Sequence, residues 1–280
     1  MSFDPHQYLK TLGPQKDDDI DLGLAALSLA ALTQPGISVE RYTHHIKQLV
    51  LEVQARYGDF LEEEEPDSAQ TQLKALKHVL VTEHGYGGDH ETYDDLQNAN
   101  LIRVIDRVKG LPITISILYM HVAEKCGWRV YGLDIPGHFC CRLDKGSERI
   151  IFDPFNDCKI LGAADLRFMV KTARGDHAEL SADYFEPVSK RAVLMRLQNN
   201  IKYRQIEGED YAGALQTIES MHLIDPDEYR LLLDEGVLFA KTENKMAAIR
   251  ALEAYVGRAP MGRDRQEALI ILEQLRQGLN

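Results

Sequence analysis

Two side chains, His138 and Asp153, are placed to carry out acid–base chemistry together. Alternating apolar and polar residues predict strands at His138–Leu143 and Arg149–Phe155, joined by a turn at Asp144–Ser147. On neighbouring antiparallel strands a carboxylate can accept the imidazole N–H and fix the tautomer of the ring. We therefore predict a His–Asp pair, the part of a nucleophilic site that activates the attacking group. The competing interpretation is structural: His138 completes a turn, and Asp153 caps the loop that follows it.

A nucleophile for this pair is harder to find. Thr114 is the hydroxyl nearest the start of a predicted helix over Ile113–Lys125, where the helix dipole favours a developing anion. A threonine nucleophile, however, needs an adjacent base or a terminal amine. Cys140 shares a strand face with His138, while Cys141 faces the other way, and such cysteines are usually small buried hydrophobic residues. Thr114 and Cys140 therefore remain candidate nucleophiles.

The remaining thiols and histidines do not indicate a metal or a cofactor. The four cysteines have no Cys-x-x-Cys spacing, and a chain of this size does not need disulfides, so we predict four free thiols. Two groups of side chains could be considered as metal ligands, and neither matches a known ligand spacing. They are His138, Cys140, Asp153, Asp157 and Cys158, and His84 with His90. We predict no metal and no cofactor.

Composition limits the partners of this chain. Its 280 residues and 44% hydrophobic content predict two or three packed units. A net charge of -12 argues against nucleic acid and anionic membranes, because both would meet like charge over most of the surface. The apolar run Leu22–Leu32 is too short to span a bilayer, and no secretory signal is evident. We expect a cytoplasmic protein.

A helical segment is expected over residues 1–82. Apolar residues recur at helical spacing over Leu22–Ala31, Val39–Tyr57 and Ser68–Thr82. The acidic tract Glu62–Asp67 repels itself and contains a proline, so it predicts a loop or a frayed helix end before the third helix. The acidic run that precedes the first helix is expected to supply its N-terminal cap.

The central region, residues 83–187, is expected to hold a buried helix against a small antiparallel sheet. A glycine-dense bend over 84–90 and a short helix over Leu96–Val108 come first. The helix that follows is apolar on almost every side, with Pro112 in its first turn and Gly127 beyond its end. The period then changes to two, and Trp128–Ile135 predicts the first of three strands. This order of elements predicts an α+β fold.

The last region, residues 188–280, shows a repeat with a period of 34 residues. Small or apolar residues and a proline recur at this spacing, a pattern typical of tetratricopeptide-like helix pairs. The matched positions are Asp210 with Asn244, Ala214 with Ala248, Leu215 with Ile249, Ile218 with Leu252, Glu219 with Glu253, Met221 with Tyr255, and Pro226 with Pro260. About two such units and a final helix are predicted, presenting a concave surface for a protein.

Several motifs in order resemble the bacterial SirB family over roughly residues 80–280. They are Tyr86-Gly87-Gly88-Asp89 with Tyr93, Asn98-Ala99-Asn100-Leu101, Gly110-Leu111-Pro112-Ile113-Thr114, Pro136-Gly137-His138-Phe139 and Asp153-Pro154-Phe155. The resemblance implies a papain-like or transglutaminase-like core with an appended tetratricopeptide-like segment. Some eukaryotic F-box proteins carry a similar core. The resemblance also implies that His138 and Asp153 match two members of a catalytic triad. The position of the third member, a cysteine, is occupied here by Pro112.

A proline side chain has no lone pair with which to attack a carbonyl, so we expect a degenerate enzyme. The first hypothesis is a protein that binds or regulates a protein or peptide through a cleft around Pro112, Gly137, Phe139 and Phe155 or through its repeats. The second is a hydrolase or acyl-transfer enzyme of the transglutaminase or cysteine-peptidase type with a relocated nucleophile, which would be Thr114, Cys140 or a water activated by His138. The third gives His138 and its carboxylate a purely structural role. The sequence leaves partner, substrate and oligomeric state open.

Overall fold

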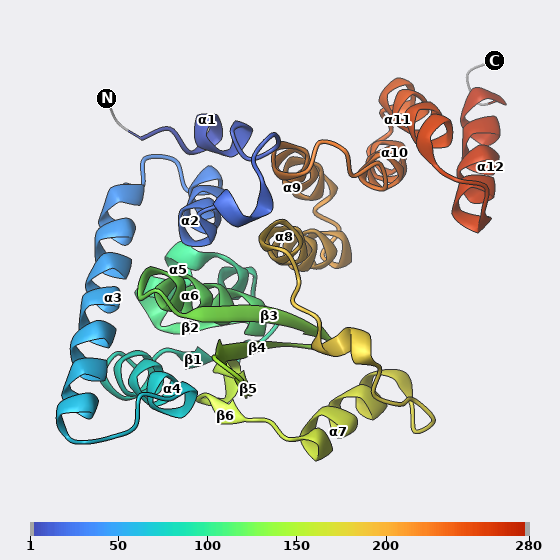
Figure 1. Cartoon of the computed structure of the whole chain (residues 1–280). Coiled ribbons are helices and arrows are strands. Elements are labelled where there is room, and N and C mark those ends of the chain that lie inside the picture. Colours follow the sequence, from blue (N-terminus) through green and yellow to red (C-terminus); the bar gives the residue numbers. More distant parts are fainter. Residues whose placement is uncertain (1–2, 278–280) are drawn as a thin grey trace. The chain divides into compact units, whose positions relative to one another are not determined.

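A computed structural model describes residues 3–277, which form two compact units (Figure 1). The larger unit comprises residues 3–8 and 15–197, and the C-terminal unit comprises residues 9–14 and 198–277. The N-terminal helices and the central region are therefore packed together in the larger unit.

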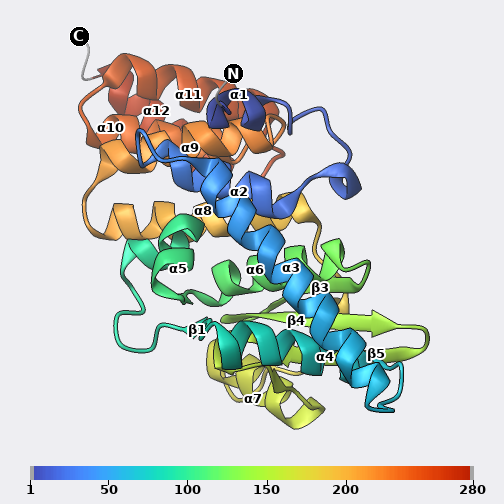
Figure 2. The ribbon, with the colours of Figure 1, turned by 90° about the vertical axis from the view of Figure 1, so that its left-hand side faces the viewer.

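The N-terminal helices pack along one side of the larger unit. Helix α2 begins after Asp21, whose carboxylate accepts the amide of Leu24 at 2.9 Å, and this cap confirms the prediction from the acidic run. Helix α3 packs against α2, α4 and α6, and Figure 2 shows it crossing the unit from end to end. The elements are α1 (Pro5–Lys10), a 3-10 turn (Asp17–Asp19), α2 (Leu22–Leu32), α3 (Val39–Glu62) and α4 (Ala69–Lys77).

The predicted helix over Ser68–Thr82 is in fact two kinds of helix. Ser68 is the N-cap, since its hydroxyl accepts the amide of Thr71, and the α-helical part ends at Lys77. The chain continues as a π-helix over His78–Glu83. A π-turn contains one more residue than an α-turn, so it shifts the side chains that follow around the helix axis. Apolar periodicity alone does not distinguish the two.

The predicted helix over Leu96–Val108 is interrupted at Asn100. A 3-10 turn covers Leu96–Ala99 and helix α5 covers Leu101–Arg107. Asn100 adopts an extended conformation, and its side chain accepts the amide of Arg103 at 3.0 Å, so it starts a new helix instead of continuing the old one.

The buried helix and the sheet form the centre of the larger unit, as predicted. Helix α6 (Pro112–Lys125) is buried from Pro112 to Ala123 and packs against β3 and β4. The sheet is antiparallel in the order β3-β4-β5-β6, so it has one more short strand than predicted. Its strands are β3 (Arg129–Ile135), β4 (His138–Lys145), β5 (Glu148–Asp153) and β6 (Lys159–Ile160).

A helix that the sequence analysis did not identify, α7 (Ala163–Arg174), packs on the sheet. Leu166 and Val170 of this helix form a buried cluster with Leu133, Ile135 and Cys140. Cys140 lies opposite Leu133 in the β3–β4 register, so both point to the face that α7 covers. A 3-10 turn at Ala182–Phe185 then leads to helix α8 (Lys190–Glu207).

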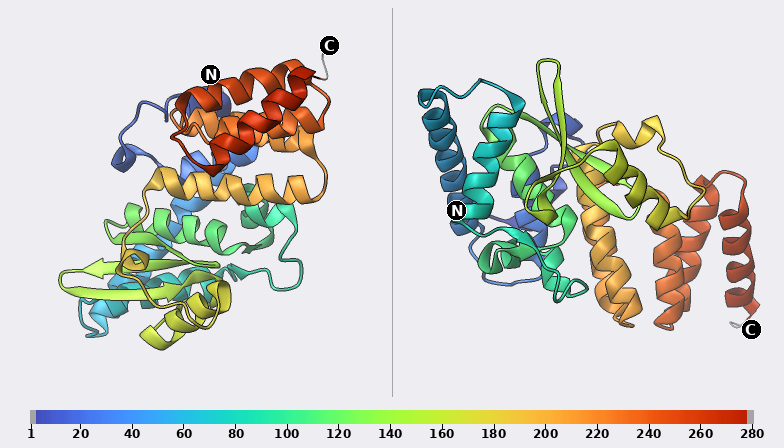
Figure 3. Two further views of the ribbon diagram at one scale, coloured as in Figure 1. Left: turned by 90° about the vertical axis from the view of Figure 1, so that its right-hand side faces the viewer. Right: turned by 90° about the horizontal axis from the view of Figure 1, so that it is seen from below.

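The C-terminal unit confirms the helical repeat. Helices α9 and α11 begin 34 residues apart, and their caps are the predicted pair, Asp210 and Asn244. Ala214 and Ala248 are fully buried, which lets the helices of each pair approach closely. Figure 3 shows these helices side by side. They are α9 (Tyr211–Ile224), α10 (Leu231–Lys241), α11 (Lys245–Arg258) and α12 (Arg263–Gln277).

Among residues 3–277, none of the helices has both the length and the apolar character that a membrane span requires.

Candidate functional site

The structure brings His138 and Asp153 together, as the strand pattern predicts. His138 is the first residue of β4, Asp153 is the last residue of β5, and these two strands are paired. The Nε2 atom of His138 lies 2.8 Å from Oδ2 of Asp153. The histidine side chain is 17% exposed and the carboxylate only 1%. The carboxylate of the pair therefore lies in the core, and its imidazole is partly exposed at the surface.

Asp153 accepts two further hydrogen bonds, which fix its position. The amide of Phe155 donates to Oδ1 at 3.0 Å, and the side-chain amide of Asn156 donates to Oδ2 at 2.7 Å. Burial by itself raises the pKa of this carboxyl, but the contacts with His138, Asn156 and Phe155 together hold its pKa below the ordinary value. Asp153 therefore stays ionised at neutral pH and orients the imidazole.

Phe155 is the centre of an aromatic cluster beside this pair. Its ring lies 6.0 Å from the ring of His138, 4.6 Å from His90 and 5.9 Å from Tyr93, measured between centroids. Phe155 is 6% exposed, whereas His90 is exposed and Tyr93 is 40% exposed. We call His90, Tyr93, His138 and Phe155 the aromatic cluster. The sequence analysis did not assign His90 or Tyr93 to the site, although Tyr93 belongs to the motif run that carries the family resemblance.

The loop that carries His90 and Tyr93 is anchored by Asp89. This buried carboxylate accepts the backbone amide and the hydroxyl of Thr92, and the guanidinium of Arg107 at 2.7 Å. The Thr92 amide is the largest of the contacts that hold the pKa of Asp89 well below its ordinary value. Arg107 also donates to Asn98, whose side-chain amide donates to the carbonyl of Thr92. The loop is therefore preorganised.

The first turn of α6 contains a proline and a buried threonine. Pro112 occupies the first turn, where its missing N–H costs no hydrogen bond, and the residue before it, Leu111, supplies no side-chain cap. Thr114 is fully buried, and its hydroxyl has no hydrogen-bond partner among the described residues. The structure thus places the candidate Thr114 in the interior without a base that could accept its proton.

The four cysteines are free thiols, and each is held in its neutral form by burial. Burial raises the pKa of Cys126 and of Cys158 to about 12, and it raises the pKa of Cys140 and of Cys141 further. Cys140, the other candidate nucleophile, is fully buried in the cluster with α7. None of these thiols has the low pKa of a nucleophilic cysteine.

Two residues that were predicted to bind a partner have clear packing roles. Gly137 has a φ of +78°, which a residue with a Cβ rarely adopts, and a Cβ there would lie 2.9 Å from Cβ of Ala173 on α7. Phe139 is 1% exposed, and its ring lies so close to Gly132 that no side chain would fit at that position. Phe139 therefore has almost no surface to present, whereas Phe155 supports the exposed part of the aromatic cluster.

One group of side chains among the described residues has the geometry of a metal site. Ligand atoms of Glu52, Glu83 and His84 lie within 4.8 Å of one another. Neither of the ligand groups considered from the sequence includes the two glutamates. Nε2 of His84 lies 2.6 Å from Oε2 of Glu52, and the two side chains are about one-third exposed, so an ordinary surface pair accounts for this contact.

A family comparison agrees with this arrangement of a buried helix and an antiparallel sheet. A family model described as the transglutaminase-like superfamily matches residues 40–199, more than half of the chain. The chain belongs to the transglutaminase-like superfamily. A tetratricopeptide-repeat model matches residues 201–276, in agreement with the repeat counted in the sequence. Within this superfamily the chain combines an intact His–Asp pair with a proline at the start of the buried helix.

Relatives of this transglutaminase-like protein occur in bacteria and animals. A UPF0162 protein of Xylella fastidiosa is 25% identical over 245 residues, which cover 86% of this chain and 84% of the relative. A UPF0162 protein of Vibrio cholerae is 24% identical over 244 residues, or 87% and 88% of the two chains. F-box only protein 21 of Mus musculus is 26% identical over 178 residues, 60% of this chain but only 27% of that protein. No solved structure matches significantly.

Proposed function

We propose that this protein is a degenerate member of its superfamily, which binds a peptide or protein at the aromatic cluster and catalyses no acyl transfer. Acyl transfer through a covalent intermediate requires an attacking group whose proton a base can accept. The observation that carries this proposal is the start of α6, where Pro112 stands beside an otherwise intact His–Asp pair. Of the groups that a hydrolase could use instead, Thr114 and Cys140 are fully buried, which leaves a water activated by His138 as the alternative.

The aromatic cluster has the properties of a binding surface. Tyrosine and histidine present large, rigid side chains with polar edges, and tyrosine is enriched at positions that dominate binding energy. The buried ring of Phe155 packs against Tyr93, and the Asp89–Arg107 pair anchors the loop that carries Tyr93. Little conformational entropy would therefore be lost when a partner binds. His138 would contribute a ring that Asp153 already orients.

The C-terminal repeats are consistent with the same kind of role, because tetratricopeptide arrays present surfaces to other proteins. We also propose, from the motifs quoted above, that this chain is a member of the SirB family. We also include the cytoplasm as its location, where four free cysteines would remain reduced.

A peptide-display selection against the purified protein tests this function. Dissociation constants of selected peptides would be measured by fluorescence anisotropy for the native protein and for Tyr93→Ala and His138→Ala. Because removal of a central aromatic anchor costs about 2 kcal/mol, we expect each substitution to weaken binding by about 30-fold. Circular dichroism would confirm that the variants remain folded.

Tyr203→Ala is the matched control, because Tyr203 is a 59% exposed tyrosine in the C-terminal unit. It should leave the affinity within two-fold of the native value. If Tyr203→Ala weakens the peptides while Tyr93→Ala and His138→Ala do not, the binding site is on the repeats and the proposed use of the aromatic cluster is wrong.

A further inference from the structure

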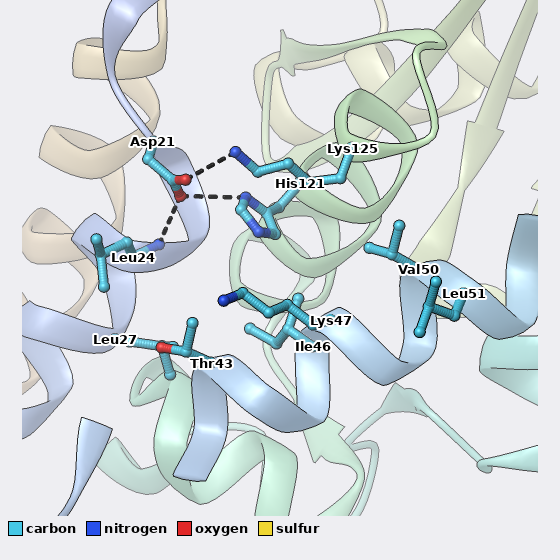
Figure 4. Close-up of a pocket in the computed structure, with 10 residues that line it drawn as sticks. All are labelled: Asp21, Leu24, Leu27, Thr43, Ile46, Lys47, Val50, Leu51, His121 and Lys125. Atoms are coloured by element: carbon cyan, nitrogen blue, oxygen red, sulfur yellow. Dashed lines mark hydrogen bonds and ion pairs between the residues drawn. The ribbon is translucent and has the colours of Figure 1, made fainter. Parts of the chain in front are cut away.

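A cavity of about 600 Å³ lies between α2, α3 and α6 in the larger unit, on residues that the His–Asp site does not use (Figure 4). Its volume is within the range of about 300–1,000 Å³ that is typical of small-molecule pockets. Half of the ten lining residues are aliphatic, and these are Leu24, Leu27, Ile46, Val50 and Leu51. An apolar lining of this size favours a hydrocarbon ligand over a polar one.

His121 contributes a hydrogen-bond donor to this cavity. The residue is 8% exposed, and its Nδ1 atom accepts the backbone amide of Gly23 at 3.2 Å. Because an amide N–H can only donate, Nδ1 has no proton in the neutral ring and Nε2 carries it; in a charged ring Nε2 carries a proton as well. Among the described residues Nε2 has no hydrogen-bond partner, so its N–H is available to a ligand in the cavity.

Two lysines also line the cavity, and only one of them has an anionic partner. Lys125 donates to Oδ2 of Asp21 at 2.8 Å, so its charge and that of the carboxylate are mutually neutralised. Lys47 is exposed and has no hydrogen bond or ion pair within residues 3–277. In Figure 4 the His121 ring lies between Asp21 and Lys47, with the free ring nitrogen on the side away from Asp21.

We infer that this cavity binds a free straight-chain monocarboxylate of medium length. Its carboxylate would accept the Nε2–H of His121 and pair with the ammonium of Lys47. Its hydrocarbon chain would lie against the aliphatic side chains of α2 and α3. A hydrogen bond and a cation at one end of an apolar cavity are the recognition elements of an amphipathic anion, because each end of such a ligand is matched.

Titration calorimetry with hexanoate, octanoate, decanoate and decanol, each below its aggregation concentration, tests this site. Affinity should rise about four-fold for each added methylene, because each one removes further apolar surface from water. Decanoate should bind at least ten-fold more tightly than decanol. Lys47→Met keeps the length of the side chain and removes its charge, so this variant should lose the preference for decanoate over decanol.

Two further variants separate this site from general effects of charge or folding. Lys77→Met removes an exposed lysine from the same unit but outside the cavity, and it should leave the decanoate affinity unchanged. Thr43→Phe fills the cavity from a half-buried position on α3 and should abolish binding of decanoate and decanol without lowering the unfolding temperature.

Three results would overturn the inference. The first is the absence of decanoate binding at millimolar concentrations. The second is an affinity that is independent of chain length or equal for decanoate and decanol. The third is sedimentation evidence of a dimer that Thr43→Phe dissociates and decanoate does not, because the cavity would then be part of an interface between two copies of the chain.

Discussion

Asp153→Ala is expected to lower the free energy of unfolding by about 3 kcal/mol at pH 7. The substitution removes a fully buried carboxylate that three groups contact, the ring of His138 and the nitrogens of Phe155 and Asn156. The backbone amide of Phe155 and the half-buried ring of His138 are then left without an acceptor, whereas the exposed Asn156 can bind water instead. Each buried donor that loses its acceptor typically costs about 1–3 kcal/mol. Urea denaturation followed by circular dichroism would measure the difference.

The pH dependence of this loss identifies its cause. The pKa of Asp153 is lowered in the folded protein, so its charge stabilises the fold above about pH 4, the ordinary pKa of an unfolded aspartate. That stabilisation disappears as the pH falls below this value and through the folded pKa. The difference in the free energy of unfolding between the native protein and Asp153→Ala should therefore become smaller below about pH 4.

Asp134→Ala provides the matched control on β3, which β4 separates from the strand of Asp153. Asp134 pairs with Arg196, but its side chain is 52% exposed, and exposed ion pairs contribute about 1 kcal/mol or less. An equal loss of stability in the two variants would contradict a special role of the buried pair.

Gly88→Ala is expected to lower the free energy of unfolding by about 2–3 kcal/mol and to abolish peptide binding at the aromatic cluster. A Cβ on Gly88 would lie 2.6 Å from the ring of Phe155 and 2.7 Å from its Cγ, so the whole ring has to move. Overpacking a well-filled interior typically costs about 1–3 kcal/mol. The displaced ring would also move its neighbours His90, Tyr93 and His138. Chemical denaturation and anisotropy with selected peptides would measure both effects.

Gly87→Ala is a control at the adjacent position. A Cβ on Gly87 would meet Oδ1 of Asp157 at 3.4 Å and Nζ of Lys109 at 3.7 Å, which are ordinary contacts. This variant should change stability by about 0.5 kcal/mol or less and should bind the peptides normally. Both residues form the short strand β1 (Gly87–Gly88). If Gly87→Ala and Gly88→Ala behave alike, the loss would come from the backbone of β1, and Phe155 would have no special role.

The sequence predicted the parts of the fold that have a regular period. Alternation located β3, β4 and β5 to within two residues, and it placed His138 and Asp153 on paired strands. A repeat of 34 residues predicted the helix pairs of the C-terminal unit, and its matched positions Asp210 and Asn244 are the N-caps of α9 and α11. These patterns can be recognised in the sequence because the same kind of position is buried at regular intervals along the chain.

Two of the features that the sequence did not predict depend on single side-chain contacts. Asn100 interrupts a helical pattern because its side chain caps the next turn. Helix α7 is a different case, because Leu166, Met169, Val170 and Ala173 recur at helical spacing, so the sequence does contain a pattern that indicates this helix. His90 and Tyr93 join the site only because Phe155, more than sixty positions later, folds onto Gly88. No local pattern reports a contact of this kind.

The rate of thiol alkylation as a function of pH, mapped to each cysteine by mass spectrometry, tests most directly whether this protein lacks a nucleophile. The measurement would compare the native protein with His138→Ala. Because burial raises the pKa of all four thiols, we expect no cysteine to react as a thiolate below about pH 9, and we expect His138→Ala to change none of the rates. A cysteine with an apparent pKa well below about 8.5 that His138→Ala restores to the ordinary value would contradict this account and would identify a relocated nucleophile.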